Sequence, residues 1–180
     1  MVESAVSEFM DDPNSKSMHR ISPIPLDSQS FAAFGDVLEA TGKHRIAINE
    51  GTTVRFHDLA KIDVEKDGGK PIVNIFRGTP YPFPLTIRMM EKHPFGSQLF
   101  MPLEPFEYLV AVAEAKQKVE VEDVVIFACS PKQGVNFRPG VWHHPLLVLS
   151  EKQDFLVIDR GGEGINLIEQ ELAVPIVIDL

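Results

Sequence analysis

Several features are scarce in this chain of 180 residues, and each shortage narrows what the protein can be. The only cysteine is Cys129, which excludes an internal disulfide. No stretch approaches the roughly eighteen apolar residues that a membrane-spanning helix needs. The first residues lack the basic start and apolar block of a secretory signal peptide. We therefore expect a soluble, cytoplasmic protein that does not insert into a membrane.

Positive charge is also in short supply. The chain has 17 lysines and arginines against 26 acidic residues, which gives a net charge of -9 at pH 7. Nucleic acids bind to basic surfaces, so we expect no nucleic-acid partner. The sequence also contains no glycine-rich phosphate loop, no nucleophile elbow and no Cys-x-x-Cys pair. These absences lead us to expect no organic cofactor.

Short apolar runs separated by turn residues dominate the rest of the sequence. Fourteen prolines and twelve glycines are spread along the chain, and helical spacing is almost absent. The length and an apolar content of 44% suit one globular domain with a substantial core. This pattern predicts an all-β fold, either a barrel or a two-sheet sandwich without an internal pocket. We expect a flexible N-terminal arm over residues 1–18 and a single domain over residues 19–180.

The predicted elements are short strands and one short helix. The helix covers residues 27–34, with Asp27 as its N-cap and Gly35 at its end. The predicted extended segments are residues 21–26, 37–39, 45–48, 53–56, 61–64, 71–77, 84–91, 98–101, 107–113, 124–128, 134–137, 146–149 and 154–159. The apolar end, residues 173–180, is expected to pack on the barrel or on a second copy of the chain.

One polar stretch that follows a predicted strand carries candidate chemistry. Glu91 and His93 lie two residues apart, so extended backbone turns both to the same face as Leu85 and Ile87. A carboxylate and an imidazole at the end of an apolar face are costly to bury without a partner. A turn then leads to Gln98 at the start of the next strand. This stretch therefore indicates a polar site inside the fold.

A second polar stretch contains the adjacent histidines His143 and His144. In extended backbone they face opposite sides, so one of them readily points inward. Nitrogen and oxygen ligands of this kind suit nickel, manganese, iron or zinc. The candidate metal ligands are Glu91, His93, Gln98 and His143. The alternative is that these side chains are polar strand ends that satisfy one another.

Two further residues are candidates for binding a small acid. Arg77 lies beside Gly78 at a predicted strand end, where its planar guanidinium could bind a carboxylate, and Asn74 precedes it by three residues. The alternative is a surface arginine paired with one of the many acidic residues. Cys129 follows an apolar run and is expected to be a small core residue rather than a nucleophile.

The motifs that contain these residues occur together and in a fixed order. They include Asn74-Ile-Phe-Arg77 and Asp154-Phe-Leu-Val-Ile-Asp159-Arg-Gly-Gly. The most specific are Glu91-Lys-His93-Pro-Phe-Gly-Ser-Gln98 and, after it, Val141-Trp-His143-His144-Pro. In these motifs the chain resembles the ureidoglycolate lyase family, small cupin enzymes of allantoin breakdown. The resemblance extends from about residue 20 almost to the end.

The resemblance implies a double-stranded β-helix (cupin) barrel with a few short helices, and a homodimer. It implies the cleavage of (S)-ureidoglycolate into glyoxylate and urea in purine catabolism. His93 and His143 would take the histidine positions of the two cupin motifs. Glu91 stands where many metal cupins have another histidine, and Gln98 where they have glutamate. The family further implies a weakly held divalent metal, most readily nickel.

With this substrate in view, each candidate residue has an expected role. His93 and His143 would hold the metal or the substrate hydroxyl, and Glu91 or His144 would transfer the proton. Arg77 and Asn74 would bind the substrate carboxylate, and Gln98 is a further candidate for binding the substrate. Two other functions stay open at this point. One is a non-catalytic cupin that binds a small acid as a sensor or store, and the other is a different metal-dependent cupin enzyme.

Overall fold

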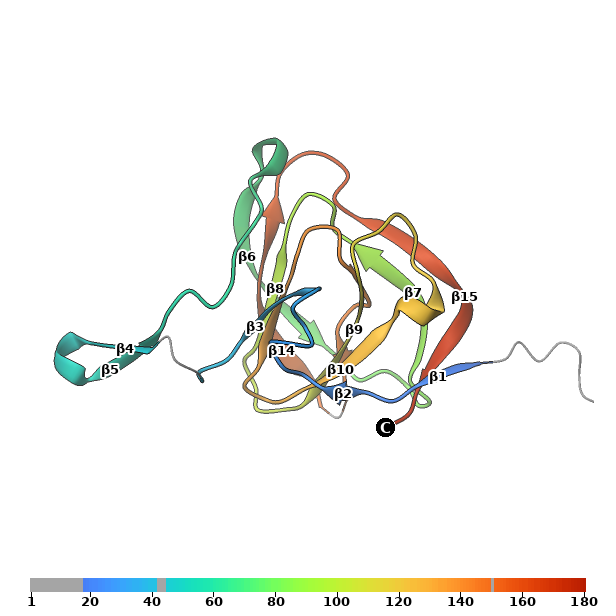
Figure 1. The fold of residues 1–180 in the computed structure, drawn as a ribbon, viewed down its shortest axis with the longest axis horizontal. Coiled ribbons are helices and arrows are strands. Elements are labelled where there is room, and N and C mark those ends of the chain that lie inside the picture. The colour runs from blue at the N-terminus through green and yellow to red at the C-terminus, as the bar shows by residue number, and fades with distance from the viewer. Residues whose placement is uncertain (1–17, 42–44, 150) are drawn as a thin grey trace, which may run out of the picture.

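The computed structural model describes residues 18–41, 45–149 and 151–180, and over these ranges the fold is almost entirely β (Figure 1). The predicted arm, residues 1–18, lies outside the described ranges except for Met18 and is not tested. Across the described ranges, no helix is long and apolar enough to span a bilayer.

Two curled sheets form the body of the molecule. The eight-stranded sheet contains β1 (His19–Ile21), β2 (Ile24–Pro25), β7 (Thr86–Lys92), β9 (Tyr108–Ala113), β10 (Val125–Cys129), β12 (Trp142–His143), β13 (Leu147–Val148) and β15 (Ile168–Ile178). The five-stranded sheet contains β3 (Gly35–Leu38), β6 (Lys70–Gly78), β8 (Gln98–Pro102), β11 (Gly134–Phe137) and β14 (Gln153–Gly161). The predicted all-β barrel is confirmed.

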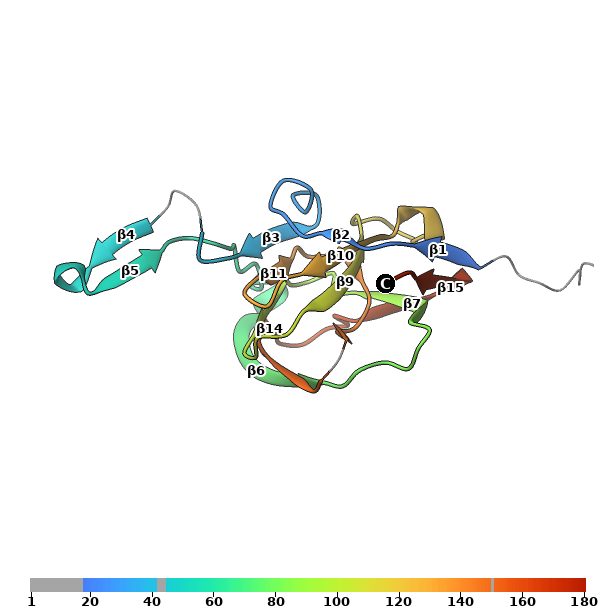
Figure 2. The same cartoon turned by 90° about the horizontal axis from the view of Figure 1, so that it is seen from below.

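A third, two-stranded sheet stands away from the barrel. It is the hairpin of β4 (Arg45–Ile48) and β5 (Thr53–Phe56), and both views show it projecting to one side (Figures 1 and 2). The helices of the described ranges are single 3-10 turns, namely η1 (Asn49–Gly51), η2 (Lys66–Gly68) and η3 (Val121–Asp123).

Strand β9 separates two apolar clusters and explains why its sequence is apolar throughout. Tyr108, Val110 and Val112 pack into the cluster between the two sheets, together with aromatic residues of β8, β11 and β14. Leu109 and Ala111 pack into a second cluster with residues from β7, β15 and η3. A strand buried on both faces loses the alternation of polar and apolar residues.

Two predicted elements are wrong. Residues 61–64 contain no strand, although Val64 is buried. Residues 27–34 form consecutive turns instead of a helix. The Asp27 carboxylate does accept the backbone N–H groups of Gln29 and Ser30, as an N-cap would. The backbone bonds here are a mixture of three-residue and four-residue turns around the buried Phe31, so no continuous helix forms before β3 begins at Gly35.

The inward face of β7 also differs from the prediction. Ile87 and Met90 lie three residues apart, yet both are fully buried in the same apolar cluster as Leu85. The alternation is broken because the neighbouring strand β15 has a register shift between Glu171 and Ile176. Leu85 and Ile87 therefore do not share a face with Glu91.

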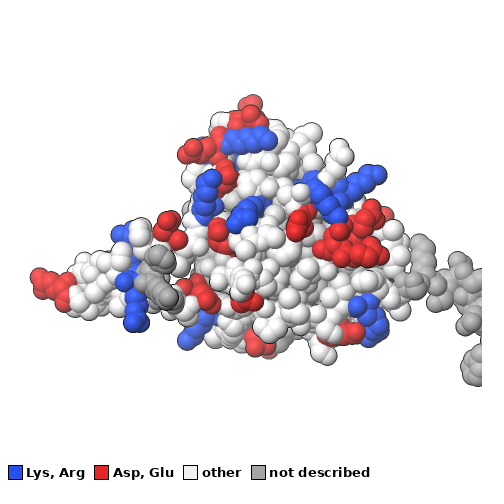
Figure 3. Space-filling view, viewed as in Figure 1, with Lys and Arg blue, Asp and Glu red and all other residues white. Residues whose placement is uncertain are grey.

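Charged side chains are mixed on the surface of the molecule. On the face seen in Figure 3, lysines and arginines lie among aspartates and glutamates and do not gather into one band. This distribution is in keeping with the acidic composition, and no basic stripe of the kind that binds nucleic acid stands out on that face.

Candidate active site

Three of the predicted site residues meet at the end of the barrel interior. Glu91 on β7 and His143 on β12 are directly paired across the sheet, and His93 follows two residues after Glu91. One ligand atom from each of the three lies within 4.8 Å of the others. The distance from His143 Nε2 to Glu91 Oε1 is 3.6 Å. We call these three residues the His–Glu cluster.

The two imidazoles of the cluster are held in the same tautomer. His93 Nδ1 lies 2.6 Å from the Asn166 carbonyl oxygen, and His143 Nδ1 lies 3.1 Å from the Val141 carbonyl oxygen. A backbone carbonyl only accepts hydrogen bonds, so each Nδ1 carries the proton and donates it. The two Nε2 atoms are left with free lone pairs, and both are buried without a hydrogen-bond partner.

Aromatic packing fixes the orientation of His143. Its ring stacks on Phe137 of β11 with centroids 4.6 Å apart and an interplanar angle of 18°. The ring of His93 lies 5.2 Å away on another side, centroid to centroid. His143 is only 2% exposed. The cluster is therefore held in place by both sheets, which favours a preorganised site.

Electrostatics keep the cluster in the protonation state that can act as base or ligand. Burial alone would raise the pKa of the Glu91 carboxyl, but His143, 3.6 Å away, and the other nearby histidines outweigh burial and lower that pKa. Burial lowers the pKa of His93, and His143 lowers it further. Glu91 is therefore ionised and His93 neutral near pH 7.

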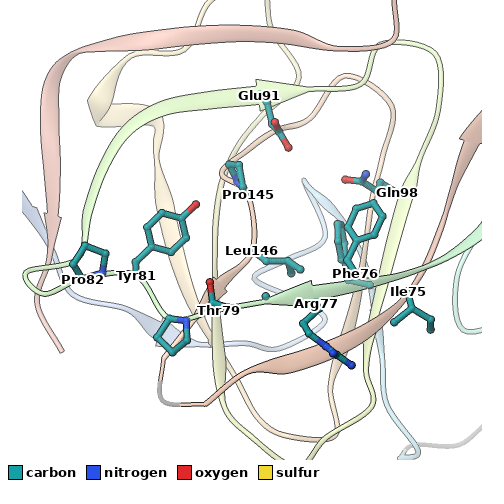
Figure 4. Close-up of a pocket in the computed structure, with 13 residues that line it drawn as sticks. Ile75, Phe76, Arg77, Thr79, Tyr81, Pro82, Glu91, Gln98, Pro145 and Leu146 are labelled. Carbon is teal, nitrogen blue, oxygen red and sulfur yellow. The ribbon is translucent and has the colours of Figure 1, made fainter.

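A cavity of about 590 Å³ opens beside the cluster (Figure 4). Glu91 of β7 and Gln98 of β8 both point into it, and Tyr81 comes from the loop between β6 and β7. The wall also includes Phe76, Phe100 and Leu146, which make it partly apolar. A cavity of this size holds a small organic molecule with room for water.

Gln98 also reaches a second, smaller cavity. This cavity of about 260 Å³ is lined by His93, Ser97, Gln98, Asp159, Arg160, Asn166 and Leu167. Burial raises the pKa of Asp159, while a hydrogen bond from the Gln98 side chain acts in the opposite direction. Gln98 Oε1 is buried and has no hydrogen-bond partner.

The structure does not bring Arg77 to the cluster. Its guanidinium binds both carboxylate oxygens of Asp154 at 2.7 and 2.8 Å, and its side chain is 68% exposed. In Figure 4 it points away from Glu91. Arg77 thus forms an ion pair with Asp154, but it also lines the larger cavity, and its predicted role in binding a substrate carboxylate stays a prediction.

The remaining predicted residues lie near the cluster without joining it. Asn74 Nδ2 lies 3.4 Å from Asp159 Oδ1, on the side of the smaller cavity. His144 is 8% exposed, and its ring meets the edge of Tyr81 at the cavity wall with centroids 5.6 Å apart. Burial lowers the pKa of His144, so this imidazole is neutral near pH 7.

Comparison with known proteins identifies the family. The family model for ureidoglycolate lyase matches residues 18–179. The ureidoglycolate lyase of Burkholderia mallei (strain NCTC 10229) is 52% identical over 155 residues, which cover 86% of this chain and 91% of that protein. The ureidoglycolate lyase of Rhizobium leguminosarum bv. trifolii (strain WSM2304) is 47% identical over 154 residues, 86% of this chain and 92% of its own. That of Pseudomonas syringae pv. syringae (strain B728a) is 46% identical over 149 residues, 83% and 88% respectively.

This chain belongs to the ureidoglycolate lyase family. The predicted resemblance is confirmed, and with it the expectation of an enzyme. Two of the motifs on which the resemblance rested contribute the His–Glu cluster and Gln98.

Several residues of this family member's site were not singled out by the sequence. Phe137 is one of many phenylalanines, and only its stacking on His143 reveals its part. Asn166 acts through its backbone carbonyl, which no residue type encodes. Tyr81 offers a weak signal, as an aromatic residue between two prolines in a loop that borders the cavity.

Proposed function

We propose that this chain splits (S)-ureidoglycolate into glyoxylate and urea, and that the His–Glu cluster is its catalytic centre. Family membership supports the reaction. The observation that carries the site is the convergence of two buried, unpaired imidazole lone pairs and one ionised carboxylate beside a cavity. Such groups are costly to bury unless they bind something.

The reaction is an elimination that needs no nucleophile. The substrate carries a hydroxyl and a ureido nitrogen on one carbon, next to a carboxylate. A base removes the hydroxyl proton, the oxygen electrons form the C=O bond of glyoxylate, and the C–N bond breaks. The leaving nitrogen takes up one proton and departs as urea, so no water is consumed. A positioned base and acid supply typically ~10²–10⁴-fold acceleration.

Glu91 is the proposed base. It points into the cavity, and its low pKa keeps it ionised near pH 7. After accepting the hydroxyl proton, the same carboxyl can return it to the leaving nitrogen. His144, neutral and at the wall behind Tyr81, is the alternative proton carrier. The positions of these two groups favour Glu91, because it lines the cavity directly.

The His–Glu cluster also fits a divalent metal. His93 and His143 would offer their Nε2 atoms, and Glu91 one carboxylate oxygen, which leaves its second oxygen to accept a proton. The carbonyl partners on both Nδ1 atoms are typical of metal-bound histidines. When bound, such an ion would supply positive charge to the substrate oxygens and lower the pKa of the hydroxyl. Nickel is the proposed metal.

A product assay tests this function. Purified protein is incubated with (S)-ureidoglycolate in large excess, and glyoxylate, urea and ammonia are measured over time. We expect glyoxylate and urea in equal amounts over many turnovers, without ammonia. Binding without turnover would instead identify a sensor or storage protein, and ammonia release would identify a hydrolase.

We also propose that two copies of the chain form a dimer through the β4–β5 hairpin. An isolated two-stranded hairpin is marginally stable in water. This hairpin leaves Ile46 45% and Val54 52% exposed, and β6 leaves Val73 67% and Ile75 56% exposed. Apolar surfaces on both elements suit the packing of one copy's hairpin on the other copy's β6.

Light scattering in solution tests the dimer. We expect a molar mass of twice the 20.1 kDa of one chain, and a shift toward one chain mass for Val54→Asp. A charged residue on an exposed strand is tolerated in a monomer, so the fold itself should remain intact. A single-chain mass for the unaltered protein would reject this proposal.

A further inference from the structure

We propose that Asp159 holds the amide of Gln98 so that its Oε1 atom faces the larger cavity and accepts an N–H of the substrate's ureido group. This inference rests on the proposed function and adds how the substrate is oriented. Gln98 thereby determines which end of the substrate lies beside it, and Asp159 is a positioning residue.

Gln98 is buried at the border between the two cavities. It is only 7% exposed and lines both of them. Its Oε1 atom has no hydrogen-bond partner, and Figure 4 shows this oxygen turned toward the larger cavity. A buried amide oxygen without a partner costs free energy unless a ligand supplies the donor.

Strand pairing places Asp159 next to Gln98. Strands β8 and β14 are antiparallel, with Leu99 opposite Ile158, so the next position of the same register sets Gln98 opposite Asp159. Directly opposed residues point to the same face of a sheet. Both side chains line the smaller cavity. Burial raises the pKa of the Asp159 carboxyl, and Gln98 acts to lower it, as a nearby N–H donor does.

The partner chemistry decides which end of the amide faces which cavity. A carboxylate only accepts hydrogen bonds, and Asn74 Nδ2 also lies within 3.4 Å of Asp159 Oδ1 as a donor. Gln98 must therefore present its N–H₂ to Asp159. The carbonyl oxygen at the other end of the same amide then faces the larger cavity.

This orientation distinguishes the two ends of the substrate. The ureido group carries N–H donors, whereas the carboxylate carries only acceptors. The acceptor Gln98 Oε1 binds the ureido N–H groups and repels the carboxylate. This places the ureido nitrogen near Gln98 and the hydroxyl toward Glu91. A site built to bind one kind of hydrogen-bonding group strongly rejects its opposite.

A double-mutant cycle tests the coupling. Gln98→Glu alone sets two carboxylates side by side, and we expect KM to rise by about tenfold or more. Asp159→Asn alone frees the amide to turn either way, with a rise of roughly threefold to fivefold. In the double variant, the amide introduced at position 159 would donate to the carboxylate introduced at position 98. That carboxylate would again leave an acceptor facing the cavity, and KM should return to within about threefold of the unaltered value.

Asp154→Asn is the matched control, because Asp154 lies on the same strand but pairs with Arg77 on the outer face. We expect no change in its KM. If the double variant is no better than Gln98→Glu, the coupling is absent and the inference fails, while glyoxylate production by the unaltered protein still upholds the proposed function.

Which atom of the Gln98 amide faces the larger cavity can also be determined without an activity assay. Neutron diffraction on the deuterated protein separates N–D₂ from oxygen, and N–D₂ facing the larger cavity would overturn the inference even if the protein produced no glyoxylate.

Discussion

His93 and His143 face each other with ring centroids 5.2 Å apart, and each has its Nδ1 atom bound to a backbone carbonyl. The carbonyls belong to Asn166 and Val141, two segments distant from each other in the sequence. Both imidazoles consequently present a bare Nε2 to the same buried space. The backbone carbonyls therefore orient both rings without the help of a ligand.

The first prediction concerns metal binding. After treatment with a chelator, the protein should take up about one divalent ion per chain, because two imidazoles and one carboxylate form a compact ligand set. His143→Ala removes one ligand, and its uptake should fall below detection in the same titration. Elemental analysis after dialysis measures this. Equal uptake by both proteins would place the metal elsewhere.

The second prediction concerns Glu91. Glu91→Gln keeps the size of the side chain but removes its ability to accept a proton, so kcat should fall by about 10²–10⁴-fold. The thermal unfolding temperature should change little, since Glu91 lines the cavity and glutamine fills the same space there. Glu107→Gln, an exposed glutamate before β9, is the control. A kcat within a few-fold of the unaltered protein would transfer the role of base to another group.

The third prediction concerns the support beneath the turn between His93 and Gln98. Arg160 is 7% exposed and donates to the carbonyl oxygens of Lys66 and Glu163. It also packs so closely under Gly96 that a Cβ there would lie 2.6 Å from Arg160 Cβ.

Arg160→Ala would leave those carbonyls without donors, and the free energy of unfolding should fall by roughly 2–4 kcal/mol. Denaturant unfolding measures it, with Arg77→Ala as the control. The Arg77 guanidinium is solvent-exposed, so its loss should leave stability close to that of the unaltered protein. An equal loss of unfolding free energy in the two variants would mean that Arg160 does not stabilise the turn between His93 and Gln98.

Much of the fold follows from the sequence because its strands are bounded by proline and glycine. Residues 134–137, for example, form β11 with the predicted bounds. The meeting of Glu91, His93 and His143 was also predictable, because the motifs containing them occur in a fixed order.

Other features depend on distant partners that no local pattern reveals. The face of β7 changes because of a shift in β15, far along the chain. Arg77 is paired with Asp154, 77 residues later, a contact that the sequence around Arg77 does not reveal. The tautomers of the histidines likewise depend on backbone carbonyls of Val141 and Asn166.

The fourth prediction concerns the only cysteine. Cys129 is 1% exposed in the core, and burial raises the pKa of its thiol to about 12. A raised pKa keeps the thiol protonated below that pH, and the protonated form is a poor nucleophile. A disulfide reagent at pH 8 should leave the folded protein unmodified and label it fully after denaturation. Rapid labelling of the folded protein would contradict the described burial.

The most direct measurement is the rate of glyoxylate formation by His93→Ala and His143→Ala. His19→Ala is the matched control, because that histidine lies on the edge strand β1, which β15 separates from β7. If the His–Glu cluster is the catalytic centre, both variants should lose about 10³-fold or more in kcat/KM while the control stays unchanged. Rates within about threefold of the unaltered protein in both variants would show that the reaction takes place elsewhere.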